Sequence, residues 1–349
     1  MMNPEKLKHI RALSERRLRD ELQSTWLQDY YDPLTHEAEE DTDKPFSGIF
    51  TFFRAPRVRS LDGADIALIG VPFDLGVTHR PGARHGPGQI REMSAVTDGP
   101  MHHQSQIIPA EHCEYIDYGD VPFQALYEID KCIDEIESFY HRVCDAGVTP
   151  ISAGGDHSIS YPILKALGRD QPVGLVHIDA HCDTMGEYAG SKFHHGGPFR
   201  NAAVAGVLDP ERTIQIGIRG PSEPLWAFSR DTGMRVIHIE EFYEMGIDAV
   251  VAEIHRVCGD GPTYVSFDVD GLDPAFAPGT GTPEIGGLAA FEGQQIVRGC
   301  RGLNLVGGDV VEVAPPFDPG GTTALVGATL MWEILCVLSD AIAARRETA

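Results

Sequence analysis

The feature that most constrains the fold is a regular alternation of short apolar segments with longer amphipathic ones, which runs from Ala64 to the C-terminus. Each apolar segment is short enough for one buried strand, and several are followed by stretches with helical periodicity that end near glycine or proline. Strands that alternate with helices form a parallel sheet covered on both faces. We therefore expect an α/β fold.

The predicted strands are Ile66–Val71, Val148–Ala153, Gly174–Asp179, Thr213–Ile218, Val236–Ile239, Thr263–Asp268 and Leu305–Val311. The predicted helices include Ala125–Ala146, Ile159–Leu167, Asp248–Val257, Ala290–Gly302 and a final helix from Thr323 to Ala344. In open parallel sheets, ligands gather at the carboxyl ends of the strands. We therefore expect the chemistry where strands give way to loops.

The first 45 residues are predicted to lie outside this core. Glu5 to Tyr31 has the spacing of a surface helix, and residues 36–43 resemble a solvated acidic linker. The segment could be a partly disordered tail, or an arm that clasps a neighbouring subunit. We expect an N-terminal arm and linker at 1–45 and one large domain at 46–349.

The composition narrows the partners and the compartment. A formal net charge of -24 argues against nucleic acid or an anionic membrane as partner, and it would attract a cationic substrate. The seven cysteines include no Cys-x-x-Cys pair, which is typical of a reducing compartment. The charged N-terminus lacks the apolar core of a signal peptide, and no apolar run approaches the length of a membrane span. We expect a cytoplasmic protein.

Polar side chains with the properties of metal ligands follow two of the predicted strands. Asp179, His181 and Asp183 alternate at the end of one strand, where side chains two residues apart point to the same face. Asp268 and Asp270 repeat the pattern after another apolar segment. Three such groups on one side of a strand end are hard to explain without a cation.

A histidine after a third strand completes the predicted centre. His157 follows Gly154 and Gly155, whose freedom allows a tight turn at the strand end. Two histidines and four aspartates suit Mn²⁺, with Ni²⁺, Co²⁺ or Zn²⁺ as alternatives, and bridging carboxylates suggest two ions. The aspartates could instead cap helices or pair with arginines. Several unpaired carboxylates along apolar strands would, however, be costly.

Three segments resemble the motifs of the ureohydrolase superfamily, the family of arginase and agmatinase: Gly154–Ser158, Asp179–Thr184 and Ser266–Pro274. Segments that resemble agmatinase-type members are Gly70–Asp74, Arg84–Pro87, Ala277–Glu284 and Asp309–Val313. Thr282–Gly287 and the C-terminal half resemble guanidinobutyrate and guanidinopropionate hydrolases. The resemblance covers the chain from about Ser47 to the C-terminus.

The resemblance implies a three-layer α/β/α fold with an eight-stranded parallel sheet and two divalent ions, Mn²⁺ or alternatively Ni²⁺. It implies hydrolysis of a guanidino group to urea and an amine. By motif match, His157, Asp179, Asp183 and Asp268 would hold one or both ions. The residues that would complete the two-ion site are Asp179, His181, Asp268 and Asp270. It also implies a homo-oligomer, trimeric or hexameric, with a paralogous chain as an alternative partner.

Three residues take catalytic roles by the same resemblance. Glu312 matches the carboxylate that grips the guanidinium group. Asp183 would orient the attacking hydroxide, and His195, which is followed by Gly196, matches the histidine that shuttles protons. A subunit that binds without turnover is the alternative, but the complete ligand set argues against it.

The substrate is less constrained by the sequence. Arginases, and several relatives that act on guanidino acids, carry asparagine where this chain has Met185, whose thioether cannot donate a hydrogen bond to a carboxylate. Met185 therefore argues against arginine and favours a small or apolar tail, unless it merely packs in its loop. Lys192 could bind the carboxylate of guanidinobutyrate or guanidinopropionate, or be an exposed lysine, and His194 is expected in the pocket wall. Agmatine, free guanidine and alkylated biguanides such as metformin, the last two with Ni²⁺, stay open.

Overall fold

The computed structural model describes residues 2–14, 46, 48–95, 105–220 and 225–348. The chain divides into two compact units, Met1–Ile49 and Phe50–Ala349. The first unit contains helix α1 (Pro4–Ser14), which coincides with the start of the helix predicted from Glu5. The rest of that predicted helix and the acidic stretch at 36–43 lie outside the described residues.

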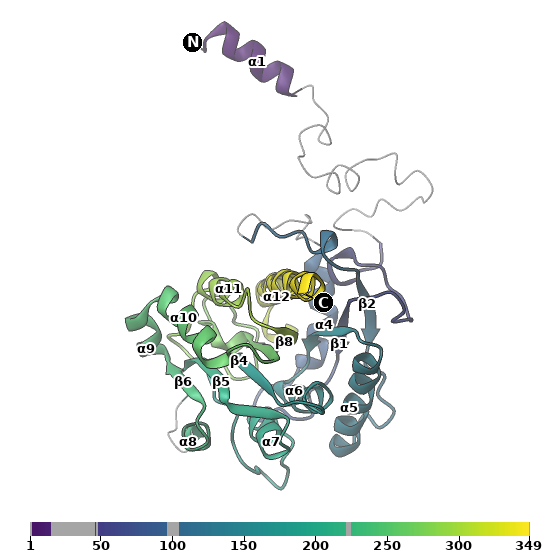
Figure 1. Ribbon diagram of the computed structural model, residues 1–349, viewed down its shortest axis with the longest axis vertical. Helices are drawn as coiled ribbons and strands as arrows, with labels where there is room; N and C mark the ends of the chain where they lie inside the picture. The colour runs from purple at the N-terminus through teal and green to yellow at the C-terminus, as the bar shows by residue number, and fades with distance from the viewer. Residues whose placement is uncertain (1, 15–45, 47, 96–104, 221–224, 349) are drawn as a thin grey trace. The chain divides into compact units, whose positions relative to one another are not determined.

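The second unit is built on one eight-stranded parallel sheet in the order β2-β1-β3-β8-β7-β4-β5-β6 (Figure 1). The strands are β1 (Ile66–Val71), β2 (Tyr115–Asp120), β3 (Thr149–Gly154), β4 (Val173–Ile178), β5 (Leu208–Ile218), β6 (Arg235–His238), β7 (Thr263–Asp268) and β8 (Leu305–Val311). The expected three-layer fold with eight parallel strands is confirmed.

Strand β2 is the one that the apolar pattern did not predict. It lies at the edge of the sheet and carries Asp117 and Asp120, so it has no apolar run. Asp117 is nevertheless buried, because Arg91 donates a hydrogen bond of 2.8 Å from Nε to its Oδ2. An ion pair here replaces the apolar contacts that identify the other strands.

Helices cover both faces of the sheet (Figure 1). The helices packed on one face are α4 (Gly86–Ser94), α9 (Ile239–Met245), α10 (Ile247–Cys258), α11 (Ala290–Gly299) and α12 (Thr322–Thr348). The helices on the other face are α5 (Ile129–Asp145), α6 (Ser160–Leu167) and α7 (Pro198–Val204). Alternate residues of each strand serve the two cores: in β1, Ile66 and Leu68 contact the first, and Ala67, Ile69 and Val71 the second.

Helix α12 corrects the expectation that no apolar segment is long enough to span a membrane. Its stretch Thr322–Glu347 meets the length and composition of a membrane helix. However, 78% of its most apolar window is buried within the unit, where it packs against α4, α11 and β8. The apolar composition is therefore accounted for by its place in the core.

The order of the strands positions the candidate site. The four strands followed by the predicted ligands and Glu312 are neighbours, in the order β3-β8-β7-β4. Because all the strands are parallel, their carboxyl ends meet at one edge of the sheet. Asp268, the last residue of β7, and the loops that carry His157, Asp179 and Glu312 therefore lie side by side.

Candidate metal centre

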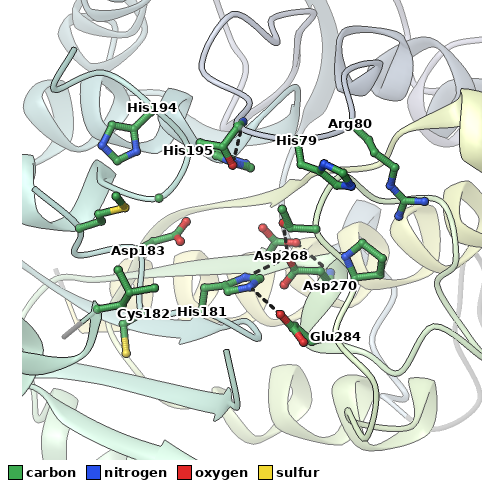
Figure 2. Close-up of a pocket in the computed structure, with 16 residues that line it drawn as sticks. His79, Arg80, His181, Cys182, Asp183, His194, His195, Asp268, Asp270 and Glu284 are labelled. Carbon is green, nitrogen blue, oxygen red and sulfur yellow. Dashed lines mark hydrogen bonds and ion pairs between the residues drawn. The ribbon is translucent and has the colours of Figure 1, made fainter. Parts of the chain in front are cut away.

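A cavity of about 520 Å³ opens at this edge of the sheet (Figure 2). The residues that line it are Thr78, His79, Arg80, His181, Cys182, Asp183, Met185, His194, His195, Gly196, Leu225, Asp268, Asp270, Thr282, Pro283 and Glu284. They come from the loops after β1, β4, β5 and β7. Predicted metal ligands, predicted catalytic residues and predicted substrate-binding residues thus meet in one cavity. His157, Asp179 and Glu312 are buried and are not among its lining residues.

The first carboxylate cluster differs from its expected geometry. Strand β4 ends at Ile178, so Asp179, His181 and Asp183 lie in the following loop and not along the strand. The loop turns because Asp179 Oδ1 accepts a hydrogen bond of 2.6 Å from the backbone N–H of His181. Asp183 has a left-handed backbone, with φ of 51°. The alternation that drew attention to these residues is therefore not what brings them together.

The structure gathers one half of the predicted ligands around His157. Its Nδ1 lies 2.9 Å from Asp183 Oδ2 and 3.2 Å from Oδ2 of both Asp179 and Asp268. All four side chains are buried. Burial lowers the pKa of His157, but the three carboxylates that face its Nδ1 outweigh burial and raise the pKa well above the usual value.

The other half gathers around His181. Its Nδ1 lies 3.4 Å from Asp179 Oδ1 and 3.2 Å from Asp270 Oδ2. Asp179 thus presents one oxygen to each histidine and connects the two halves. Asp270 is held by the backbone N–H of Ala180 at 3.1 Å and by the hydroxyl of Thr282 at 3.1 Å.

The donor set fits two divalent cations. Burial, together with the charges of Asp270 and Asp179, raises the pKa of Asp268 well above its usual range, so the crowded carboxylates need cations nearby. His157 Nδ1 is buried and has no hydrogen-bond partner among the described residues, although it faces three oxygens. Carboxylate oxygens mixed with imidazole nitrogens suit Mn²⁺ and its neighbours in the first transition row.

His195 and Glu312 form a second buried pair beside this centre. His195 Nδ1 lies 2.9 Å from Glu312 Oε1, and its Nε2 lies 2.6 Å from the hydroxyl oxygen of Thr78 and 3.1 Å from the Thr78 backbone nitrogen. Burial lowers the pKa of His195, but the Glu312 carboxylate outweighs burial and raises the pKa to about 9. Glu312 has a left-handed backbone, with φ of 65°.

The two oxygens of Glu312 differ. Oε1 accepts hydrogen bonds of 2.9 Å from the backbone N–H of His157 and from the His195 ring. Oε2 is buried and has no partner among the described residues. An unpaired buried carboxylate oxygen is costly unless a ligand supplies a donor.

The three predicted substrate-binding residues of the loop after β4 are placed differently. Met185 and His194 line the cavity, and His194 Nε2 donates a hydrogen bond of 2.8 Å to the carbonyl of Gly186. Lys192 does not line the cavity: it is exposed, and its Nζ lies 4.9 Å from the ring centroid of Phe193. The structure thus supports the exposed-lysine interpretation of Lys192.

Several residues of the site were not assigned a role from the sequence. Thr78, Arg80 and Leu225 come from loops without a recognisable pattern. His177 does carry a signal, because it is a polar residue within the buried apolar strand β4. Its Nε2 lies 2.7 Å from Asp179 Oδ2, and its Nδ1 faces the side-chain amide of Gln215 at 3.0 Å.

Comparison with known proteins extends these observations along the chain. The sequence model of the arginase family matches residues 64–337. The chain is 54% identical over 303 residues to a guanidinopropionase of Pseudomonas aeruginosa, covering 85% of this chain and 94% of that protein. It is 43% identical over 303 residues to a guanidinobutyrase of the same organism, with the same shares covered. The solved structure of proclavaminate amidino hydrolase from Streptomyces clavuligerus matches with a TM-score of 0.82 and 36% identity, over 85% of this chain and 99% of that one.

Proposed function

Since the chain belongs to the arginase family and is an amidine hydrolase that converts a small guanidino compound to urea and an amine, we propose that its substrate is a short guanidino acid. The guanidinopropionase at 54% identity supports an acid over an amine-tailed substrate. Among the acids, guanidinopropionate is the first candidate and guanidinobutyrate the second.

The observation that carries the proposal is the unpaired Oε2 of Glu312. It is buried beside His195, and a Cβ built on Gly281 would come within 3.3 Å of it, so a side chain at position 281 would crowd this oxygen. A guanidinium is planar and rich in N–H donors, and it would satisfy this oxygen with a charge-assisted hydrogen bond. Glu312 would thus hold the carbon of the guanidinium next to the carboxylate clusters.

We propose that the two clusters hold the binuclear divalent-metal site of the family. We assign one ion to His157, Asp179, Asp183 and Asp268, and the other to Asp179, His181, Asp268 and Asp270. Such ions, when bound, lower the pKa of water and supply a nucleophile near neutral pH. We propose Mn²⁺, with Ni²⁺ as the alternative.

Three side chains in and beside the cavity would then bind the substrate, orient the water and transfer the proton. Glu312 binds and orients the guanidinium. Asp183, which lines the cavity, accepts a hydrogen bond from the attacking water and aims it at the guanidinium carbon. His195 delivers a proton to the amine as the carbon–nitrogen bond breaks, and its raised pKa keeps it protonated for that step.

Arg80 is the candidate partner for the acid group of the substrate, in place of Lys192. It lines the cavity, and its Nε and Nη2 donate to the carbonyls of Gly281 (3.2 Å) and Thr280 (2.7 Å). Its Nη1 has no hydrogen bond to the described residues. The Arg80 guanidinium is thus held in place by two backbone carbonyls, and it keeps N–H donors for the carboxylate of a substrate.

A second candidate follows from Met185 and Leu225, which give part of the wall an apolar surface. Such a surface favours a guanidine with a small apolar substituent, such as an N-alkylated guanidine or biguanide, or free guanidine. In that case Ni²⁺ would be the favoured ion, and agmatine and arginine would be poor substrates.

The test is a panel of guanidinopropionate, guanidinobutyrate, agmatine, arginine, guanidine and metformin, each with Mn²⁺ and with Ni²⁺, scored by urea release. We expect guanidinopropionate to give the highest kcat/KM. A higher value for agmatine would overturn the acid assignment, and one for guanidine or metformin would favour the second candidate. Glu312→Gln should remove activity towards every member, since all of them share the guanidinium.

The assembly and location of the protein are also proposals. We propose a cytoplasmic homo-oligomer, trimeric or hexameric, with no nucleic acid or membrane as partner. The charge of -24 supports the exclusion of polyanionic partners. Assembly with a paralogous chain is the alternative, and the mass of the purified protein by light scattering, with and without such a chain, distinguishes the two.

A further inference from the structure

A buried group of hydroxyls lies behind the metal centre, on the far side of His157. Asp309, on β8, is fully buried and accepts hydrogen bonds from three hydroxyls. Their donors and lengths are Ser160 Oγ to Oδ2 at 2.6 Å, Tyr264 OH to Oδ2 at 2.9 Å and Ser266 Oγ to Oδ1 at 2.6 Å. Asp309 has no ion pair with any described residue. A buried carboxylate in this position needs all of these donors.

The chain of hydrogen bonds has one direction. A carboxylate only accepts, so the single proton of the Ser266 hydroxyl goes to Asp309. Ser266 Oγ also lies 2.8 Å from His157 Nε2, and having used its proton it can only accept there. The proton of the neutral imidazole is therefore on Nε2. The lone pair of Nδ1 is left facing Asp179, Asp183 and Asp268.

We propose that Asp309, acting through Ser266, is a positioning residue that holds His157 in the tautomer able to bind a metal ion. The ring nitrogen that faces the carboxylates has to be unprotonated to serve as a ligand. Without the Ser266 acceptor, the proton could move to Nδ1, where the three carboxylates attract it. The proposal rests on the proposed function in one respect: His157 must be a metal ligand.

The geometry supplies a matched control. Ser160 and Ser266 are both fully buried serines, and both donate to the Asp309 carboxylate over 2.6 Å. Ser160 has no contact with His157 Nε2 comparable to that of Ser266. Ser160→Ala and Ser266→Ala therefore remove the same group from the same carboxylate, but only Ser266→Ala removes the acceptor of the His157 proton.

The experiment is a titration of the metal-stripped full-length protein with Mn²⁺, in which free Mn²⁺ is measured by its paramagnetic resonance signal. We expect two bound ions in the wild type. In Ser266→Ala, one ion should bind about 10- to 100-fold more weakly, as is usual for loss of a histidine's outer partner, and the other should keep its affinity. Ser160→Ala should leave both affinities within about threefold.

Asp309→Asn gives a second, independent variant, because an amide no longer obliges Ser266 to donate. It should weaken the same single ion. Equal affinities in Ser266→Ala and Ser160→Ala would overturn the relay while leaving the metal centre in place. Failure of the wild type to bind Mn²⁺ would overturn both the centre and the relay. Wrong assignment of the substrate would instead show in urea release and leave the titration unchanged.

Discussion

Two regions of the site are built from different parts of the chain: the metal centre with the adjacent His195–Glu312 pair, which we call the floor, and a set of residues from the remaining cavity lining, which we call the mouth. The floor residues are His157, Asp179, His181, Asp183, His195, Asp268, Asp270 and Glu312. All but His195 lie at or just beyond the ends of four adjacent strands. The mouth residues are His79, Arg80, Met185, His194, Leu225 and Glu284, which lie further along the loops. The order of the strands brings most of the floor residues together, whereas the positions of the mouth residues depend on the conformation of the loops.

This difference indicates that the floor residues carry out the reaction and that the mouth residues select the substrate. The floor side chains are buried except for His181, which is partly exposed, and they hold one another by hydrogen bonds and ion pairs. The mouth side chains that make polar contacts make them to the backbone, as Arg80 and His194 do, or to the floor, as Glu284 does to His181, and the six differ in chemistry. A substitution at the floor should therefore stop the reaction on all substrates, and one at the mouth should change the choice among them.

The largest effect is expected from Asp179→Asn at the floor. Asp179 contributes one oxygen to each half of the centre, so its loss should disturb both ions. We expect kcat to fall by more than about 10³-fold, because water is then no longer activated near neutral pH. Elemental analysis of the purified variant should show less than two ions per chain. A variant that keeps both ions and full activity would contradict the bridging role.

His195→Asn should have the next largest effect. It tests whether the proton-transfer step can be impaired without loss of metal binding. We expect kcat to fall by about 10²- to 10⁴-fold, as for loss of an acid–base group, while the metal content is unchanged. Urea release and elemental analysis on the same sample test both parts. Loss of metal together with activity would show that His195 supports the centre and not the proton transfer.

The pH profile sharpens the same assignment. Because Glu312 raises the pKa of His195 to about 9, the ring keeps its proton through neutral pH and loses it above. As a proton donor it works in the protonated form, so kcat/KM should fall on the alkaline side, by roughly tenfold for each pH unit above about 9. The residual activity of His195→Asn should lack this limb. A wild-type profile that still rises at pH 10 would contradict the role.

The smallest effect is expected at the mouth. Met185→Asn adds hydrogen-bonding groups to the wall and should shift the preference between guanidinopropionate and arginine by about tenfold towards arginine. The matched control is Lys192→Ala in the same loop, which should change no substrate's kcat/KM by more than about twofold, because the side chain is exposed and away from the cavity. A larger effect of Lys192→Ala would restore it as a substrate residue.

The floor was also the part most accessible from sequence. Apolar runs that end in Asp, His or Gly predicted β3, β4 and β7 and placed six ligand candidates that the structure brings together. What the pattern could not supply was the cause of their convergence, since Asp183 reaches His157 through a left-handed turn beyond the strand. Edge strand β2 was missed because an ion pair stabilises it where an apolar side chain would have marked it.

The mouth was less predictable for a physical reason. Thr78 contacts His195, which is 117 positions later in the chain. Arg80 donates a hydrogen bond to the carbonyl of Gly281, which is 201 positions later. Such contacts depend on how loops from different strands meet, and no local periodicity records them. Lys192 shows the converse: it is next to Phe193 and close in sequence to His194, yet its side chain is held at the surface over the Phe193 ring.

The left-handed backbones of Asp183 and Glu312 have a consequence for the evolution of heat resistance in this chain. A residue other than glycine in this conformation costs about 1–3 kcal/mol, and both costs fall on residues that the proposed reaction needs. Glycine at either position, or asparagine at position 312, would relieve the strain. Selection for thermal stability alone would therefore tend to replace Asp183 and Glu312. In a heat-resistant variant selected without an activity screen, we expect substitutions at these two positions to be an early cause of lost activity.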